Sequence, residues 1–76
     1  MSDENRALLD NDNRALFELL LNEGLTSQKI RAQLDVNAST CARCLGELEA
    51  ANLIDFEKGK WIVTVEGREA YKRYFG

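Results

Sequence analysis

The sequence predicts one small α+β domain in which three helices precede a two-stranded β-hairpin and a C-terminal helix follows it. Apolar residues recur at helical spacing in three segments between residues 12 and 51. Two short runs rich in β-forming residues, 53–57 and 60–65, are separated only by Lys58-Gly59, which is a hairpin signal. The chain has 76 residues, so it has room for one such unit.

The first helix is expected to run from Asp12, as its N-cap, to about Asn22. Four of its apolar positions follow helical spacing: Ala15, Leu16, Leu19 and Leu20. Gly24 is expected to end this helix in the left-handed C′ conformation, which suits a residue without a Cβ. Residues 1–11 are then a short N-terminal extension or helical turn, and residues 12–76 form the domain.

The second helix is predicted over residues 27–34, and the third runs to about Ala51. Each has two candidate N-caps: Thr26 or Ser27 for the second helix, and Asn37 or Ser39 for the third. The third helix has a single apolar stripe: Cys41, Cys44, Leu45 and Leu48. We therefore expect one side of this helix to face the core and the other side to remain open.

The hairpin and the last helix complete the predicted domain. Asn52 tolerates the left-handed conformation well and is expected to end the third helix. Alternation in the second strand predicts Trp61, Val63 and Val65 on one face of the hairpin. The last helix is expected over residues 66–75. Its apolar side holds four residues: Ala70, Tyr71, Tyr74 and Phe75.

The pair Cys41-x-x-Cys44 raises the question of a redox or metal site. A structural zinc site needs four ligands, whereas the chain has two cysteines and no histidine. A redox pair would be expected in a thioredoxin-like βαβ setting, which the predicted elements do not provide. Free cysteine behaves as a small buried hydrophobe. The sequence therefore predicts that both thiols fill the core, with no metal and no cofactor.

Composition and charge exclude several other classes of protein. The net charge is −3, and six acids against two bases fall in residues 1–23, so this is not a polybasic domain. No apolar run approaches the roughly 20 residues of a membrane helix, and the acidic N-terminus is unlike a signal peptide. Without histidine, a glycine-rich phosphate loop or a nucleophile with its base, we expect no enzyme. These features favour a cytoplasmic protein.

Residues 26–54 resemble the helix-turn-helix stretch of MarR-like and related bacterial and archaeal winged-helix regulators. Ten residues match that pattern in register: Ile30, Leu34, Val36, Ser39, Thr40, Arg43, Leu45, Leu48, Leu53 and Ile54. Thr64, Gly67 and Arg68 match the segment that closes the wing in many such proteins. The resemblance covers about residues 12–72. It implies a winged helix-turn-helix fold and binding to double-stranded DNA, with the third helix in the major groove.

In such a fold, eight residues are candidates for DNA contact: Ser27, Gln28, Lys29, Ser39, Thr40, Arg43, Lys58 and Lys60. Arg43 can form a fork to guanine or pair with a phosphate, and Arg31 could add a contact. The start of the second helix can hold a phosphate on its backbone N–H groups. Each candidate also has a simpler interpretation. Ser39 and Thr40 could only cap the helix, Arg43 could be a solvated charge, and the hairpin lysines could serve solubility.

Two function hypotheses remain from the sequence. The first is a small DNA-binding transcriptional regulator that acts as a homodimer. The second is a winged-helix module that binds another protein without DNA, which the acidic balance and Glu47 favour. The aromatic residues of the last helix are interpreted in two ways as well. Tyr71, Tyr74 and Phe75 could form the dimer interface or close the core over the first helix.

Overall fold

A computed structural model describes residues 7–9 and 12–75 of the chain. Within this part, four named helices and two strands follow in order: α2 (Asp12–Asn22), α3 (Ser27–Leu34), α4 (Ala38–Ala50), β1 (Ile54–Glu57), β2 (Lys60–Val63) and α5 (Val65–Phe75). Ala7 and Leu8 are helical, and Leu9 follows in a turn. The predicted α+β class, with three helices, a hairpin and a C-terminal helix, is confirmed.

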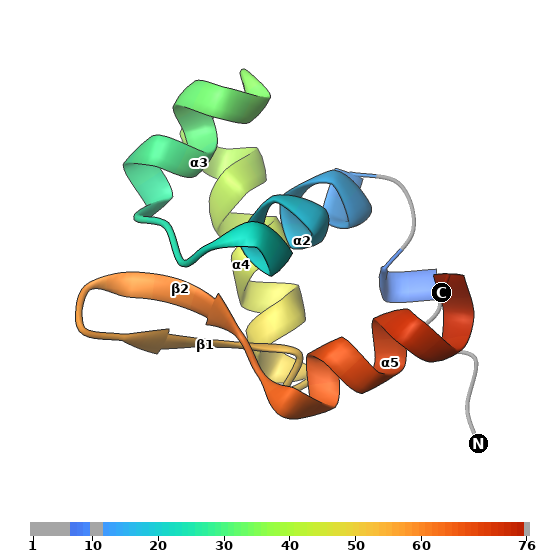
Figure 1. Cartoon of the computed structure of the whole chain (residues 1–76). Helices are drawn as coiled ribbons and strands as arrows, with labels where there is room; N and C mark the ends of the chain where they lie inside the picture. The colour runs from blue at the N-terminus through green and yellow to red at the C-terminus, as the bar shows by residue number, and fades with distance from the viewer. Residues whose placement is uncertain (1–6, 10–11, 76) are drawn as a thin grey trace.

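The three helices α2, α3 and α4 pack against one another, and the hairpin extends from their side (Figure 1). β1 and β2 pair antiparallel, with Phe56 opposite Trp61. Leu25, in the α2–α3 connection, exchanges two backbone hydrogen bonds with Trp61, at 3.1 and 2.8 Å. These bonds tie the hairpin to the helices. From the hairpin, α5 runs back along the molecule toward the start of α2 (Figure 1).

Side-chain caps begin three of the helices. The Thr26 hydroxyl accepts a 3.2 Å hydrogen bond from the Lys29 N–H, and the Asn37 side chain accepts a 2.7 Å bond from the Thr40 N–H. At the start of α5, the Thr64 hydroxyl accepts a 2.9 Å bond from the Gly67 N–H. Local capping chemistry therefore sets the first residues of α3, α4 and α5.

Three non-glycine residues in the described part of the chain take a positive φ: Asp35, Asn52 and Lys58. Asn52, with φ of 64°, follows α4, as predicted. Lys58 and Gly59 have φ of 53° and 80°, which is the pattern of a type I′ hairpin turn. This turn usually selects asparagine or aspartate at its first position, so lysine there is strained.

Three local predictions were wrong. Gly24 does not take a positive φ; instead, an added Cβ would lie 2.9 Å from Cγ2 of Ile62, so close packing against the hairpin explains the glycine. Val65 is not in the second strand: it begins α5 and is 71% exposed, because the Thr64 cap ends β2 early. Asp12 is itself helical, so the N-cap position lies outside the described residues.

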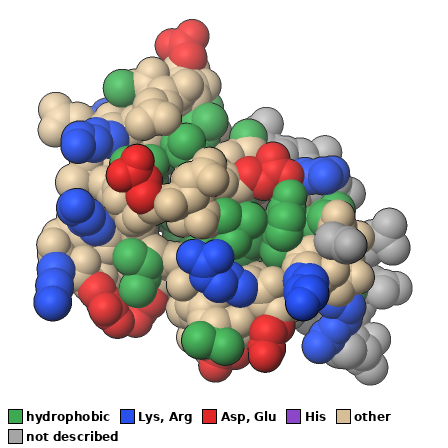
Figure 2. All heavy atoms as spheres, in the orientation of Figure 1, with side chains coloured by type: hydrophobic (Ala, Val, Ile, Leu, Met, Phe, Trp, Pro, Cys, Tyr) green, Lys and Arg blue, Asp and Glu red, His purple; other side chains and the backbone are tan. Residues whose placement is uncertain are grey.

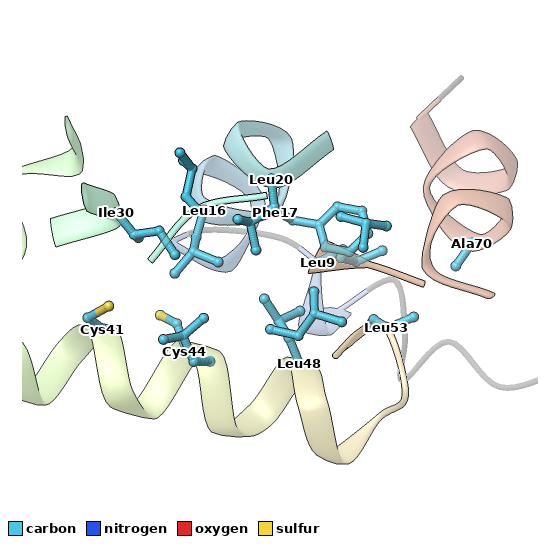
Figure 3. Packing of buried hydrophobic residues seen from close by; sticks show 14 residues of the cluster. Leu9, Leu16, Phe17, Leu20, Ile30, Cys41, Cys44, Leu48, Leu53 and Ala70 are labelled. Atoms are coloured by element: carbon cyan, nitrogen blue, oxygen red, sulfur yellow. The ribbon is translucent and has the colours of Figure 1, made fainter. Parts of the chain in front are cut away.

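The core contains both cysteines, which confirms the prediction that they face inward. Cys41 and Cys44 are not in a disulfide; each is 2% exposed, and they point from α4 toward Leu16 and Ile30 (Figure 3). Burial raises the pKa of the Cys41 thiol, which keeps it protonated and unreactive. Leu9 is also fully buried in this cluster, so the segment before α2 contributes to the core.

Two further properties concern the described residues only. None of their helices is both long enough and apolar enough to cross a membrane. Among the same residues, no three side chains of the histidine, cysteine, aspartate or glutamate type gather as a metal ion would require.

Candidate nucleic-acid interface

The open side of α4 is the first part of the candidate interface. Ser39, Arg43 and Gly46 are exposed there, opposite the buried stripe of Cys41 and Leu48. Asn37, rather than Ser39, supplies the cap, so the Ser39 hydroxyl is not used to start the helix. Thr40 is half-buried, and its backbone N–H is the group that Asn37 caps. The open side of α4 therefore presents Ser39 and Arg43 to solvent.

Arg43 is exposed but is held by a neighbour on its own helix. Its Nη1 lies 3.4 Å from Oε1 of Glu47, one turn later. An exposed pair at this spacing stabilises a helix by only about 0.3–0.5 kcal/mol. The pair therefore contributes little to the stability of α4.

The start of α3 forms the second part. Ser27, Gln28 and Lys29 are all exposed. Thr26 already satisfies the Lys29 N–H, and the first backbone N–H groups of a helix have no partner within it. With the helix dipole, the N–H groups of Ser27 and Gln28 can hold a phosphate oxygen.

A groove of about 460 Å³ runs between the start of α3 and one flank of α4. Nine residues of α3, α4 and β2 line it: Ser27, Arg31, Ala38, Cys41, Ala42, Leu45, Gly46, Glu49 and Trp61. Of the exposed residues on the open side, Gly46 lines this groove, whereas Ser39 and Arg43 are not among its lining residues. Trp61 packs against the core and also forms part of the groove wall.

The hairpin end is the third part and has mixed charge. Lys58 and Lys60 are exposed, but they share a hollow of about 500 Å³ with Glu23 and Glu57. Basic and acidic side chains alternate around this end of the molecule (Figure 2). The two lysines are thus not brought into the α4 groove, and the neighbouring acids weaken their field.

The aromatic residues of α5 lie against α2 of the same chain. The Tyr71 ring stacks on Phe17 at 5.8 Å between centroids and contacts Phe75 at 5.3 Å. The Cζ atom of Arg14 lies 4.2 Å from the centre of the Phe75 ring. These contacts match the alternative in which α5 closes the core over the first helix.

A carboxylate on α2 joins the same cluster. The Tyr71 hydroxyl donates to Oε2 of Glu18, and the Arg14 Nε lies 3.2 Å from that same oxygen. The hydrogen bond from Tyr71, followed by that from Arg14, lowers the pKa of Glu18. The same hydrogen bond raises the pKa of Tyr71. The charge of Glu18 therefore helps to fasten α5 to α2.

Asn13 is a residue that the sequence analysis missed. It lies on the buried side of α2 and is only 8% exposed. Its side-chain amide donates to the Leu8 carbonyl at 2.7 Å and to Oε1 of Glu47 at 3.2 Å. A signal was present in the sequence: Asn13 precedes Leu16, Phe17 and Leu20 at helical spacing, so a polar residue occupies a core position.

Comparison with known proteins agrees with this geometry. The family model described as a winged helix-turn-helix DNA-binding domain matches residues 8–55, from the segment before α2 to the first strand. The chain therefore belongs to the winged helix-turn-helix DNA-binding family. No curated protein and no solved structure matches the chain.

Proposed function

We propose that the protein is a cytoplasmic transcriptional regulator, of the MarR-like kind that its sequence resembles, and that it binds double-stranded DNA. In this proposal α4 enters the major groove with Ser39, Thr40 and Arg43 toward the bases. The start of α3, with Ser27, Gln28 and Lys29, holds a phosphate of the backbone.

One observation carries the proposal most: within a chain of this family, α4 buries its cysteine stripe and leaves Arg43 and Ser39 on the open side. The hairpin adds support. Lys58 occupies a left-handed position that asparagine would fill with less strain. Lys58 and Lys60 are both exposed at the hairpin end, and we infer that they contact the DNA backbone.

The test is a titration of a fluorescent DNA duplex that the protein selects from a random-sequence pool, over a range of salt concentrations. We expect binding to weaken steeply with salt, because phosphate contacts release counterions. Arg43→Ala should weaken binding about tenfold, within the range for a lost base contact. Lys58→Gln should reduce the salt dependence by about one phosphate contact.

Lys72→Gln is the matched control, because it removes an exposed cation from α5, which supplies none of the proposed DNA contacts. It should change the affinity far less than Arg43→Ala does. Equal effects of these two variants, or no binding to any duplex at low salt, would contradict the proposal.

A second candidate function is binding to another protein, and the hairpin gives a specific reason for it. Phe56 is 50% exposed and lies 4.9 Å from Trp61, which also lines the α4 groove. Exposed aromatic residues beside an apolar groove are typical of protein interfaces. Absence of DNA binding at low salt would favour this function.

We also infer that the protein acts as a homodimer through the end of α5. Tyr71 and Phe75 contact α2 of the same chain, yet these two residues and Tyr74 are only half-buried, so a second copy can cover the surface that remains. A two-fold dimer would match the two half-sites that such regulators read.

A further inference from the structure

Glu47 on α4 connects a buried amide to the arginine on the open side. Its Oε1 accepts from Nδ2 of Asn13 at 3.2 Å and lies 3.4 Å from Nη1 of Arg43. Asn13 and Arg43 thus meet at a single carboxylate oxygen. In the sequence, Glu47 favoured the protein-binding hypothesis, because an acid on this helix repels phosphate. The contacts of its carboxylate with Asn13 and Arg43 explain the acid differently: Glu47 links these two residues.

The side-chain amide of Asn13 makes a second hydrogen bond besides the one to Glu47. The same Nδ2 group donates to the Leu8 carbonyl at 2.7 Å, so both of its hydrogens point at acceptors. The side chain is 8% exposed, and its Oδ1 is buried without a hydrogen-bond partner among the described residues. An unsatisfied buried oxygen is unfavourable, and an apolar residue at this position would avoid it. Two hydrogen bonds favour the amide here: the 2.7 Å bond to Leu8 holds the segment before α2, and the 3.2 Å bond to Glu47 reaches α4.

We propose that Asn13 and Glu47 are positioning residues for Arg43, and that they make Arg43 a reader of bases rather than a general phosphate contact. This inference rests on the proposed DNA-binding function. Bidentate recognition of guanine requires the planar guanidinium in one orientation, whereas a phosphate accepts many orientations. A guanidinium already oriented by a fixed carboxylate loses less side-chain entropy when it binds. Glu47 thus lowers overall attraction to DNA while it raises discrimination between sequences.

The test compares Glu47→Gln with Glu49→Gln in the full chain. Both remove one negative charge from α4, and Glu49 is an exposed residue of the groove wall that is not part of the Asn13–Arg43 chain of contacts. A duplex selected from a random pool is titrated beside a scrambled duplex, and the ratio of the two Kd values is the readout. Both variants should bind scrambled DNA more tightly than the parent protein. Only Glu47→Gln should lower the ratio, by about three- to tenfold.

Two further variants separate positioning from folding. Asn13→Leu places an apolar side chain at the buried position, changes no charge and should lower the same ratio. In an Arg43→Ala background, Glu47→Gln should leave the ratio unchanged, because the residue to be positioned is gone. Glu47→Asp keeps the charge but has a shorter side chain. Its ratio of Kd values should therefore stay low, as in Glu47→Gln.

The outcomes are distinguishable. Identical ratios for Glu47→Gln and Glu49→Gln would overturn the positioning role and leave the DNA-binding proposal in place. A parent protein that binds selected and scrambled duplexes equally would overturn base reading by Arg43, and with it this inference. Failure to bind either duplex would overturn the proposed function as well.

Discussion

Two glycines show how differently the same residue type is used in this molecule. An added Cβ on Gly67 would lie 3.0 Å from the Leu53 carbonyl carbon and 3.0 Å from Cγ1 of Val63. At Gly46, in the middle of α4, nothing lies within 4 Å of an added Cβ. Close packing of α5 against Leu53, just before β1, therefore explains Gly67. No packing contact explains Gly46.

Alanine at these two positions should have opposite effects on stability. We expect Gly67→Ala to lower the free energy of unfolding by at least about 2 kcal/mol, because the clash involves backbone that cannot move away easily. Gly46→Ala should raise it by about 0.5–1 kcal/mol, because alanine is the better helix former. Urea denaturation followed by circular dichroism measures both. A lower free energy of unfolding for Gly46→Ala would contradict the structure, because it would mean that the open side of α4 is closely packed.

At the scale of elements, a charged cluster fastens α5 to α2. Glu18 accepts from Tyr71 and from Arg14, and both bonds lower its pKa. A carboxylate whose pKa is lower in the folded state stabilises fully above its unfolded value, about 4.3. That contribution is lost as the pH falls through the lower folded value. The domain should therefore lose stability in acid partly through Glu18.

Tyr71→Phe keeps the ring contacts but removes the hydroxyl that contributes most to the lowered pKa of Glu18. We expect this variant to show a smaller loss of stability between pH 6 and pH 3 than the parent protein. Urea denaturation at several pH values measures the difference. Glu69→Gln, which removes an exposed carboxylate from α5, is the control. This variant should lose most of the stability that the parent protein loses in acid. An unchanged acid profile for Tyr71→Phe would contradict the role of this bond.

The elements themselves follow closely from local sequence. Thr26 and Asn37 cap their helices and Asn52 takes its left-handed position, because each of these choices depends on a few neighbouring residues. The error at Gly24 has the opposite origin. Its surroundings are Ile62 and the Trp61 carbonyl, which come from a distant part of the chain.

At the scale of the whole molecule, the proposed homodimer makes a prediction about mass. Sedimentation equilibrium should give twice the 8.6 kDa mass of the chain at micromolar concentration. Tyr74→Ala should return the protein to a monomer, because it removes an aromatic side chain from the proposed interface. Phe56→Ala, which removes an exposed aromatic residue from the hairpin, is the matched control and should stay dimeric. A parent protein that sediments as a monomer throughout would refute the dimer.

The candidate site was only partly predictable from the sequence. Arg43 and Ser39 could be placed on the open side of α4 because helical periodicity separates them from the cysteine stripe. The link from Arg43 through Glu47 to Asn13 was not predictable, since Asn13 and Glu47 are 34 positions apart. The position of Lys58 and Lys60 beside Glu23 also depends on how the hairpin lies against the α2–α3 connection.

The amino-acid sequence alone determined the order of the elements, the candidate caps of α3 and α4, and the inward side of α4. These features depend on short-range hydrogen bonding and on the 3.6-residue period, both of which are present in any local stretch of chain. Only the tertiary structure decided that Trp61 would line a groove along α4, that Tyr71 would meet Glu18, and that Asn13 would reach Glu47. Such contacts form when distant segments pack, so their partners are set by the geometry of the assembled core.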